Sequence, residues 1–302
     1  MSPKPPAMML ATLSLALLPG ADGPAPVRLG PLVRLTRDGL NKQRPSWDRV
    51  GRHLLFARHA SDGSQVWQYL LDLGSPGAPP RRLTDRKTPE YNGVFAPHGT
   101  SVLFVAITLS GTQGNLDIAA VDADGTGLKM VVGDRGKLAH QDWPAWSPDG
   151  RRFAFSSTHE GNQEIYTADA DGRGLVRLTQ SPGLDAHPCW SPDGRSIAFA
   201  TDRWGGLELA AIRPDGNGLV RLTRSPGLDD YPAYSPDGTR LAFVSNRDGQ
   251  FEVYLAASDG SAPVNLSRHP LRDTFPTWTP DGRGVTFVSN RDGGFDLYTQ
   301  PV

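Results

Sequence analysis

The chain has little cysteine and almost no net charge. Its 302 residues include one cysteine, Cys189, so no disulfide can form within a single chain. The 31 Lys and Arg residues nearly balance the 32 Asp and Glu residues, which leaves a formal net charge of −1. Nucleic-acid binding needs a clustered surplus of basic residues, so this composition argues against nucleic acid as a partner.

Hydrophobic runs long enough to span a bilayer are also missing. The apolar run from Ala7 to Leu18 has 12 residues, which is too short for a stable spanning helix. It follows Lys4 and precedes small residues around Ala21, the arrangement of an export signal peptide, although a buried helix or a membrane anchor is the alternative. We predict a signal peptide over residues 1–21, a linker over 22–31, and a periplasmic or secreted mature protein without a transmembrane span.

Several catalytic motifs are absent. No GxSxG sequence of the serine hydrolases occurs, and "HEGNQ" at His159 lacks the second histidine of the HExxH zinc motif. The sequences "DGTGL", "DGRGL" and "DGNGL" look like phosphate-binding loops, but we expect them to be hairpin turns because no helix follows. Cys189 occupies the repeat position of Ala145 and Ala233, which favours a packing role over a nucleophilic one. We therefore expect no catalytic residues and no cofactor.

A repeated pentapeptide is the main feature that is present. "WSPDG" occurs twice, followed by "YSPDG" and "WTPDG", with 44 residues between successive copies. Two weaker copies, "WDRVG" and "FAPHG", precede them at spacings of 48 and 51 residues. The aromatic anchors of the six copies are Trp47, Phe95, Trp146, Trp190, Tyr234 and Trp278. A period in the mid-forties is typical of the four-stranded blade of a β-propeller.

Each copy contains four short strands separated by turns. In the fifth copy "YPAY" is an inner strand, "SPDG" a tight turn, and "TRLAFVSN" a strand with apolar residues on both faces. "RDGQ" and "SDGSAP" then separate "FEVYLAA" and "VNLS", and Asp-Gly between alternating strands is a strong hairpin signal. The pattern predicts an all-β protein.

The two ends of the repeat region complement each other. The sixth copy stops after its third strand, "FDLYTQPV", while a fourth-strand sequence, "LVRLT", precedes the first anchor. Thr36 lies 11 residues before Trp47, as Thr179 lies 11 residues before Trp190. We predict a six-bladed β-propeller over residues 32–302 that is closed by the N-terminal strand, because closure removes the exposed edges of an open array.

These repeats resemble those of the TolB family. The resemblance rests on "PAWSPDG" (144–150), "PCWSPDG" (188–194), "SNRDG" (245–249 and 289–293), "EIYTADADG" (164–172) and "VRLT" (176–179). It covers residues 32–302 and not the α/β domain that precedes the propeller in TolB. It implies an exported, monomeric, non-catalytic scaffold that binds an envelope protein, such as a peptidoglycan-associated lipoprotein, in a Tol-Pal-like role.

An enzymatic alternative follows from the same resemblance. Some TolB-like propellers are sugar-acid lyases that hold a metal with several histidines over the funnel, so a metal-dependent carbohydrate lyase is the second hypothesis. The chain has seven histidines, but no spacing pattern selects a set of ligands among them. We therefore assign no metal ligands.

Loop lengths indicate which face binds a partner. In a propeller, the turns between strands one and two and between strands three and four lie on one face, here called the bottom. The hairpin between strands two and three lies on the opposite face, the top, with the connections between blades. Both insertions of the second repeat, in "ITLSGTQGN" and "GDRGKLAHQD", fall on the top. Loops lengthened twice on one face indicate a functional face.

The predicted top face carries repeated charged and aromatic residues. Four residues after the phenylalanine of the second strand, arginine recurs in three successive copies, and five residues before the anchor, aspartate recurs in the same copies. These residues either brace the loops as exposed ion pairs, each contributing at most about 1 kcal/mol, or recognise a partner. The predicted partner-binding residues are Arg203, Arg247, Arg291, Asp185, Asp229, Asp273, His187, Tyr231 and Trp204.

Overall fold

The structure is a computed structural model that describes residues 29–110, 113–133 and 139–302. The predicted signal peptide lies outside these ranges, as does most of the predicted linker. The described residues form 24 strands, and none of them lies in a helix that could cross a membrane.

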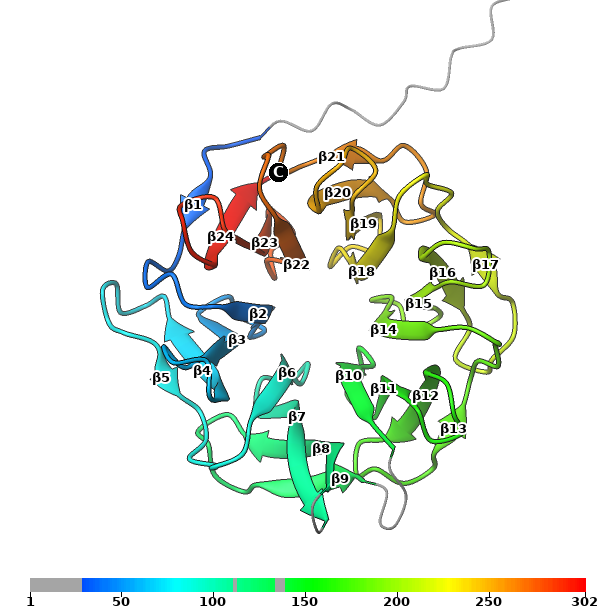
Figure 1. The fold of residues 1–302 in the computed structure, drawn as a ribbon, viewed down its shortest axis with the longest axis horizontal. Helices are drawn as coiled ribbons and strands as arrows, with labels where there is room; N and C mark the ends of the chain where they lie inside the picture. Colours follow the sequence, from blue (N-terminus) through cyan, green and yellow to red (C-terminus); the bar gives the residue numbers. More distant parts are fainter. Residues whose placement is uncertain (1–28, 111–112, 134–138) are drawn as a thin grey trace, which may run out of the picture.

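Six four-stranded antiparallel sheets are arranged around a central opening (Figure 1). The inner strands are β2 (Lys42–Trp47), β6 (Glu90–Phe95), β10 (Gln141–Trp146), β14 (Asp185–Trp190), β18 (Asp229–Tyr234) and β22 (Asp273–Trp278). The second strands are β3 (His53–His59), β7 (Ser101–Ser110), β11 (Arg152–Ser157), β15 (Ile197–Thr201), β19 (Arg240–Ser245) and β23 (Gly284–Ser289). The third strands are β4 (Val66–Asp72), β8 (Gln113–Asp122), β12 (Glu164–Asp169), β16 (Glu208–Ile212), β20 (Glu252–Ala257) and β24 (Asp296–Pro301). The outer strands are β5 (Arg81–Arg82), β9 (Lys129–Val132), β13 (Val176–Arg177), β17 (Val220–Arg221), β21 (Val264–Asn265) and β1 (Val33–Arg34). This arrangement confirms the predicted all-β, six-bladed propeller.

The N-terminal strand completes the last blade. β1 pairs antiparallel with β24, with Val33 opposite Thr299 and Arg34 opposite Tyr298. The sixth sheet therefore has the order β1-β24-β23-β22 and combines strands from both ends of the described chain. The predicted closure by the N-terminal strand is confirmed.

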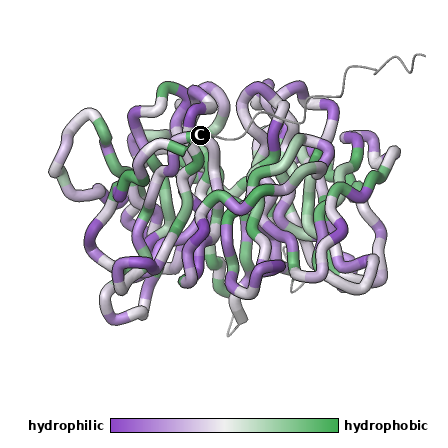
Figure 2. The backbone as a smooth tube through the Cα atoms, turned by 90° about the horizontal axis from the view of Figure 1, so that it is seen from above, coloured by the Kyte–Doolittle hydropathy of each residue, from purple (hydrophilic) through white to green (hydrophobic). Residues whose placement is uncertain are grey.

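The hydrophobic core lies between the blades. One phenylalanine of each second strand is at most 1% exposed: Phe56, Phe104, Phe155, Phe199, Phe243 and Phe287. Phe199 of β15, for example, packs in one cluster with Ala154 of the preceding blade and Trp190 of its own. Since each sheet is covered on both sides by its neighbours, its middle strands are apolar on both faces. Figure 2 shows hydrophobic segments in the middle of the molecule, between more hydrophilic loops.

Each inner strand contains a bulge. In β18 the pairing with β19 shifts between Asp230 and Ala233, so that Tyr231 and Pro232 have no partner in the register. The same shift occurs at the equivalent place of the other five blades. The first bulged residue of every blade has a positive φ, between 42° and 57°. These six residues, here called the axial ring, are Arg44, Asn92, Trp143, His187, Tyr231 and Phe275.

The top face carries one extended hairpin. β7 and β8 have 10 residues each, while β11 and β19 have 6, and Figure 1 shows the long hairpin at the edge of the ring. The insertion in "ITLSGTQGN" thus lengthens two paired strands. Part of the second insertion, residues 134–138, lies outside the described residues.

Candidate functional site

The predicted arginines and aspartates of the top face form pairs within their own blades. The three pairs are Arg203–Asp185 at 2.5 Å, Arg247–Asp229 at 2.9 Å and Arg291–Asp273 at 2.8 Å between nitrogen and oxygen. The aspartate side chains are 0% exposed, and those of the arginines are 18%, 17% and 12% exposed. The expectation of exposed ion pairs is therefore wrong, because each carboxylate is fully buried and each arginine is mostly buried.

Further contacts fix these arginines in place. Arg247 Nε donates a hydrogen bond to Ser245 Oγ at 2.9 Å, and its guanidinium carbon lies 4.8 Å from the ring centre of Tyr254. Burial raises the pKa of Asp185 and of Asp273, although their hydrogen bonds and the arginine charges act in the opposite direction. The geometry fits the bracing hypothesis, and recognition of a partner by these arginines stays a prediction.

Trp204 is the predicted site residue with the most exposed side chain surface on the top face. It lies in the loop between β15 and β16 and is 37% exposed. The guanidinium carbons of Arg221 and Arg203 lie 4.9 and 5.8 Å from its ring centre. Arg221 is itself held by Glu208 at 2.6 Å. An exposed indole between fixed arginines has the composition of an interface hot spot.

Other blades also present exposed apolar side chains on the same face. Leu228 and Leu271, in the loops that precede β18 and β22, are 40% and 42% exposed. Leu109, near the tip of the β7–β8 hairpin, is 70% exposed. The top face therefore presents exposed apolar groups from four blades.

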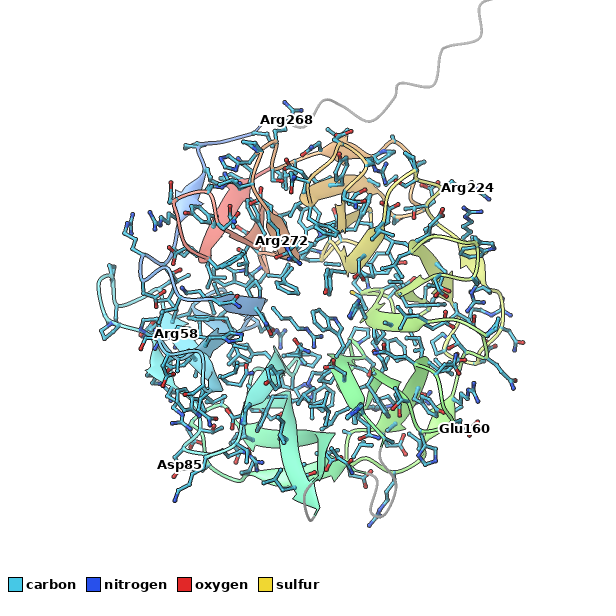
Figure 3. The ribbon with its side chains drawn as sticks, viewed as in Figure 1. Arg58, Asp85, Glu160, Arg224, Arg268 and Arg272 are labelled. Atoms are coloured by element: carbon cyan, nitrogen blue, oxygen red, sulfur yellow. The ribbon has the colours of Figure 1, made fainter. Side chains whose placement is uncertain are left out.

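His187 and Tyr231 belong to the axial ring and lie in the channel. The ring centre of Trp143 lies 4.6 Å from that of His187, 5.0 Å from that of Tyr231 and 5.9 Å from that of Phe275. Trp143 and Phe275 come from β10 and β22, which lie on opposite sides of the opening in Figure 1. His187 Nδ1 also lies 2.6 Å from Asp230 Oδ1 of the next blade. The aromatic members of the axial ring thus meet across the channel, toward which many side chains point in Figure 3.

A cavity lies on the bottom side of the axial ring. It has a volume of about 460 Å³ and reaches from Arg44 and Tyr231 to the turn prolines Pro236 and Pro280. Four of its lining residues are tryptophan anchors: Trp47, Trp146, Trp190 and Trp278. This hollow of the channel therefore lies toward the "SPDG" turns, away from the predicted binding face.

The histidines do not converge. His53 and His59 stand at opposite ends of β3, where they contact Asp48 and Gln43, and His187 contacts Asp230 three blades further along the ring. Throughout residues 29–110, 113–133 and 139–302, no group of three or more His, Cys, Asp or Glu side chains could hold a metal ion. The lyase hypothesis thus finds no ligand set among these residues.

The axial ring and the cavity were not predicted as a unit, although a signal for them exists. Proline follows the bulged residue in five of the six copies: Pro45, Pro144, Pro188, Pro232 and Pro276. Proline cannot donate to a ladder and occurs in sheets at edges or bulges, so it marks the bulge position. The side chain before it is then turned toward the axis.

Comparison with known proteins connects this architecture to a family. The TolB beta propeller domain family matches residues 136–231 and 220–302. A Tol-Pal system protein TolB of Thioalkalivibrio sulfidiphilus is 35% identical over 97 residues, which are 32% of this chain and 22% of that protein. A tricorn protease homolog of Streptomyces coelicolor is 32% identical over 168 residues, 54% of this chain and 15% of that protein. The chain thus spans less than a quarter of the length of each of these two relatives.

Solved structures share the fold. The putative TolB from Agrobacterium tumefaciens superimposes with a TM-score of 0.67 at 21% identity, over 90% of this chain and 96% of that one. An oligogalacturonate lyase from Vibrio parahaemolyticus superimposes with a TM-score of 0.61 at 15% identity, over 90% and 93%. Because the identities are this low, these two structures support the fold alone. The family match covers more than half of the sequence and includes the "PD" turns that define the repeat, so the chain belongs to the TolB beta propeller domain family.

Proposed function

We propose that the chain is an exported, non-enzymatic scaffold that binds a protein of the cell envelope through its top face, in a Tol-Pal-like role. The observation that carries this proposal is the exposed indole of Trp204 on a loop fixed by two arginines. Large aromatic side chains beside arginine dominate the binding energy of many protein interfaces.

Two further features support the top face as the contact surface. Leu109, Leu228 and Leu271 extend the apolar surface around the ring. The pairs made by Arg247 and Arg291 fix the adjacent hairpins, so little conformational entropy is lost when a partner binds there. A peptidoglycan-associated lipoprotein is the proposed partner class, the proposed compartment is the periplasm, and the scaffold is proposed to act as a monomer.

The test is a direct binding measurement between the purified chain and the peptidoglycan-associated lipoprotein of the same organism. Trp204→Ala is expected to weaken binding at least tenfold while the melting temperature stays within about 2 °C of the parent. Val50→Ala is the matched control, because Val50 is a 78% exposed apolar residue in a bottom turn. Equal affinities for the parent and Trp204→Ala would move the binding site away from this loop.

The arginines are tested by the double variant Arg247→Ala/Arg291→Ala in the same assay. A loss of binding that exceeds the loss of stability would assign recognition to these residues. Unchanged binding by a folded double variant would restrict them to bracing.

A further inference from the structure

The axial cavity has the dimensions of a small-ligand site. Its volume of about 460 Å³ lies within the range of roughly 300–1,000 Å³ that is usual for such sites. Trp143 and Phe275 of the axial ring bound its inner end, and Pro236 and Pro280 of two bottom turns bound its outer end. It lies on the opposite side of the axial ring from the proposed partner-binding face, so the two sites can be tested separately.

Prolines and tryptophans make up much of the cavity wall. Tryptophan anchors of four blades contribute to it, including Trp190 at 9% exposure and Trp278 at 5% exposure. Trp278 Nε1 donates to the carbonyl of Ala233 at 3.0 Å, which fixes the orientation of that indole. Trp47 Nε1 likewise donates to Thr286 Oγ1 at 3.1 Å. Indoles held in this way, together with prolines, favour a ligand with an apolar body, because little side-chain freedom is lost on contact.

Arg44 introduces a positive charge at the inner end of this cavity. Its Nη1 donates to the carbonyl of Asn92 at 3.0 Å, its Nη2 donates to the carbonyl of Pro144 at 2.5 Å, and it lies 4.3 Å from the ring centre of Trp143. In the part of the chain that the structure describes, no carboxylate lies within 4.0 Å of its guanidinium. Arg44 is therefore a cation held by dipoles and an aromatic face, with no carboxylate of the described residues in contact.

Burial also makes the charged form of Arg44 less stable. Burial lowers its pKa to about 9, although the charge of Asp142 acts in the opposite sense. Asp142 forms no ion pair with Arg44; its Oδ1 instead accepts hydrogen bonds from Asn92 Nδ2 and from the backbone nitrogen of Trp143, both at 2.7 Å. An anion in contact with the guanidinium would supply the charge that is missing.

The other charged residues of the wall leave a positive surplus. Asp48 lies 2.7 Å from His53 Nδ1 and also accepts a hydrogen bond from the backbone nitrogen of Arg52, so its carboxylate has partners other than Arg44. Arg49, also in the lining, is exposed. We propose that the axial cavity binds a carboxylate carried on an aromatic or aliphatic body, with the carboxylate on Arg44 and the body against the tryptophans.

The number of free donors matches a carboxylate. Guanidinium has five N–H donors, and two of them are used by the carbonyls of Asn92 and Pro144. The remaining donors can bind one monoanionic group, whereas a phosphate dianion would bring a second charge into an apolar chamber. Two sources share this chemistry, namely the free C-terminus of a peptide and a small carboxylic acid.

The test compares acids with their amides by calorimetric titration of the purified chain. The small-acid arm uses 3-phenylpropionate and 3-phenylpropionamide, and the peptide arm uses Gly-Pro-Pro-Leu-Phe with a free or an amidated C-terminus. At least one acid is expected to bind at least tenfold more tightly than its amide. The arm that binds identifies the source. If neither acid binds, or if each acid and its amide bind equally, the proposal is overturned.

A variant then assigns the charge to one residue. Arg44→Gln is expected to reduce the affinity for the binding acid at least tenfold and to leave that for the amide unchanged. Arg195→Gln is the control, because Arg195 is an 87% exposed arginine of a bottom turn and is not among the lining residues. Undiminished acid binding by Arg44→Gln would overturn the assignment. If this variant does not fold, the acid–amide comparison on the parent still decides the proposal.

Discussion

Arg34 and Asp296 lie 262 residues apart in the sequence, yet Nη2 of the arginine is 2.7 Å from Oδ2 of the aspartate. The same carboxylate accepts hydrogen bonds from Thr36 Oγ1 at 2.7 Å and from Lys42 Nζ at 3.0 Å. Lys42 and Asp296 are both fully buried. A buried ionic cluster thus joins the N-terminal segment to the last blade, in addition to the pairing of β1 with β24.

Asp296→Asn should weaken this closure strongly. Lys42 would keep Asp38 as its carboxylate partner but would lose its buried one, and removing one member of a buried pair costs about 3–5 kcal/mol. Urea denaturation should show a corresponding loss in the free energy of unfolding. Asp292→Asn is the control, because Asp292 pairs with Arg34 at 3.1 Å but is 47% exposed, and its loss should cost less than about 1 kcal/mol.

Deletion of residues 32–36 should destabilise the fold more than Asp296→Asn does. It removes β1 and leaves β24 as an unpaired edge at Tyr298, so we expect aggregation and a large fall in melting temperature. Light scattering and thermal melts would detect both. A truncated chain that stays monomeric and melts like the parent would contradict closure by this strand.

Stability should also fall in acid through Asp296. Burial acts to raise the pKa of this carboxyl, but the hydrogen bonds from Thr36, Arg34 and Lys42 outweigh it, and the pKa is lowered from its ordinary value. A lowered pKa in the folded state contributes stability that is present above the ordinary value of about 3.9 and lost as the pH falls through the lowered pKa. The difference in unfolding free energy between the parent and Asp296→Asn should therefore shrink as the pH falls from about 5 to about 3. A difference that stays constant over this interval would contradict the role of the charge.

A double-mutant cycle on Asp229 and Arg247 measures the bracing of the top face. Because Asp229 is 0% exposed, Arg247→Ala leaves a buried carboxylate unpaired and should cost about 2–4 kcal/mol. Asp229→Ala combined with Arg247→Ala should cost less than the sum of the single variants by at least about 1 kcal/mol. Additive costs in urea denaturation would mean that the two residues do not act as a pair.

Gly238→Val should destabilise the fifth blade. Gly238 has a φ of +72°, and a Cβ there would lie 3.1 Å from Cγ of Pro192, so a β-branched residue meets both strain and crowding. We expect a loss of at least about 1–2 kcal/mol in thermal unfolding. Gly206→Ala is the control, because no atom lies within 4 Å of its added Cβ and its φ is not in the positive range. Binding of an envelope partner should persist in folded Gly238→Val, since this turn lies on the bottom.

The fold follows from the sequence because repeat length and turn chemistry are local properties. The 44-residue period, the Asp-Gly turns and the spare strand at residues 32–36 determine blade number, hairpin positions and closure. Because strand direction alternates within each blade, each loop can be assigned to the top or the bottom face from its place in the repeat. These inferences use spacing and do not require knowledge of any side-chain contact.

The side-chain contacts of the channel could not be predicted from repeat spacing. Arg44 lies in one of the least regular repeats, and its carbonyl partner Pro144 is 100 residues away, two blades along the ring. The burial of Asp185 likewise depends on the depth at which a loop packs, which repeat spacing does not encode. Five residues before the anchor, the first copy has Lys42 where four of the other copies have Asp or Glu. This exchange is visible in the sequence, but the partner of Lys42, Asp296, is found only in the closed ring.

The positive φ values of the axial ring have a consequence for engineering. A residue with a side chain in this conformation costs roughly 1 kcal/mol relative to glycine, yet none of the six positions is a glycine. The bulged residues also stand outside the pairing registers of their sheets. Substitution there can therefore alter what the channel accepts while the backbone hydrogen bonds of the strand ladders are kept. A combinatorial library randomised at these six positions would sample new ligand specificities on the same propeller backbone.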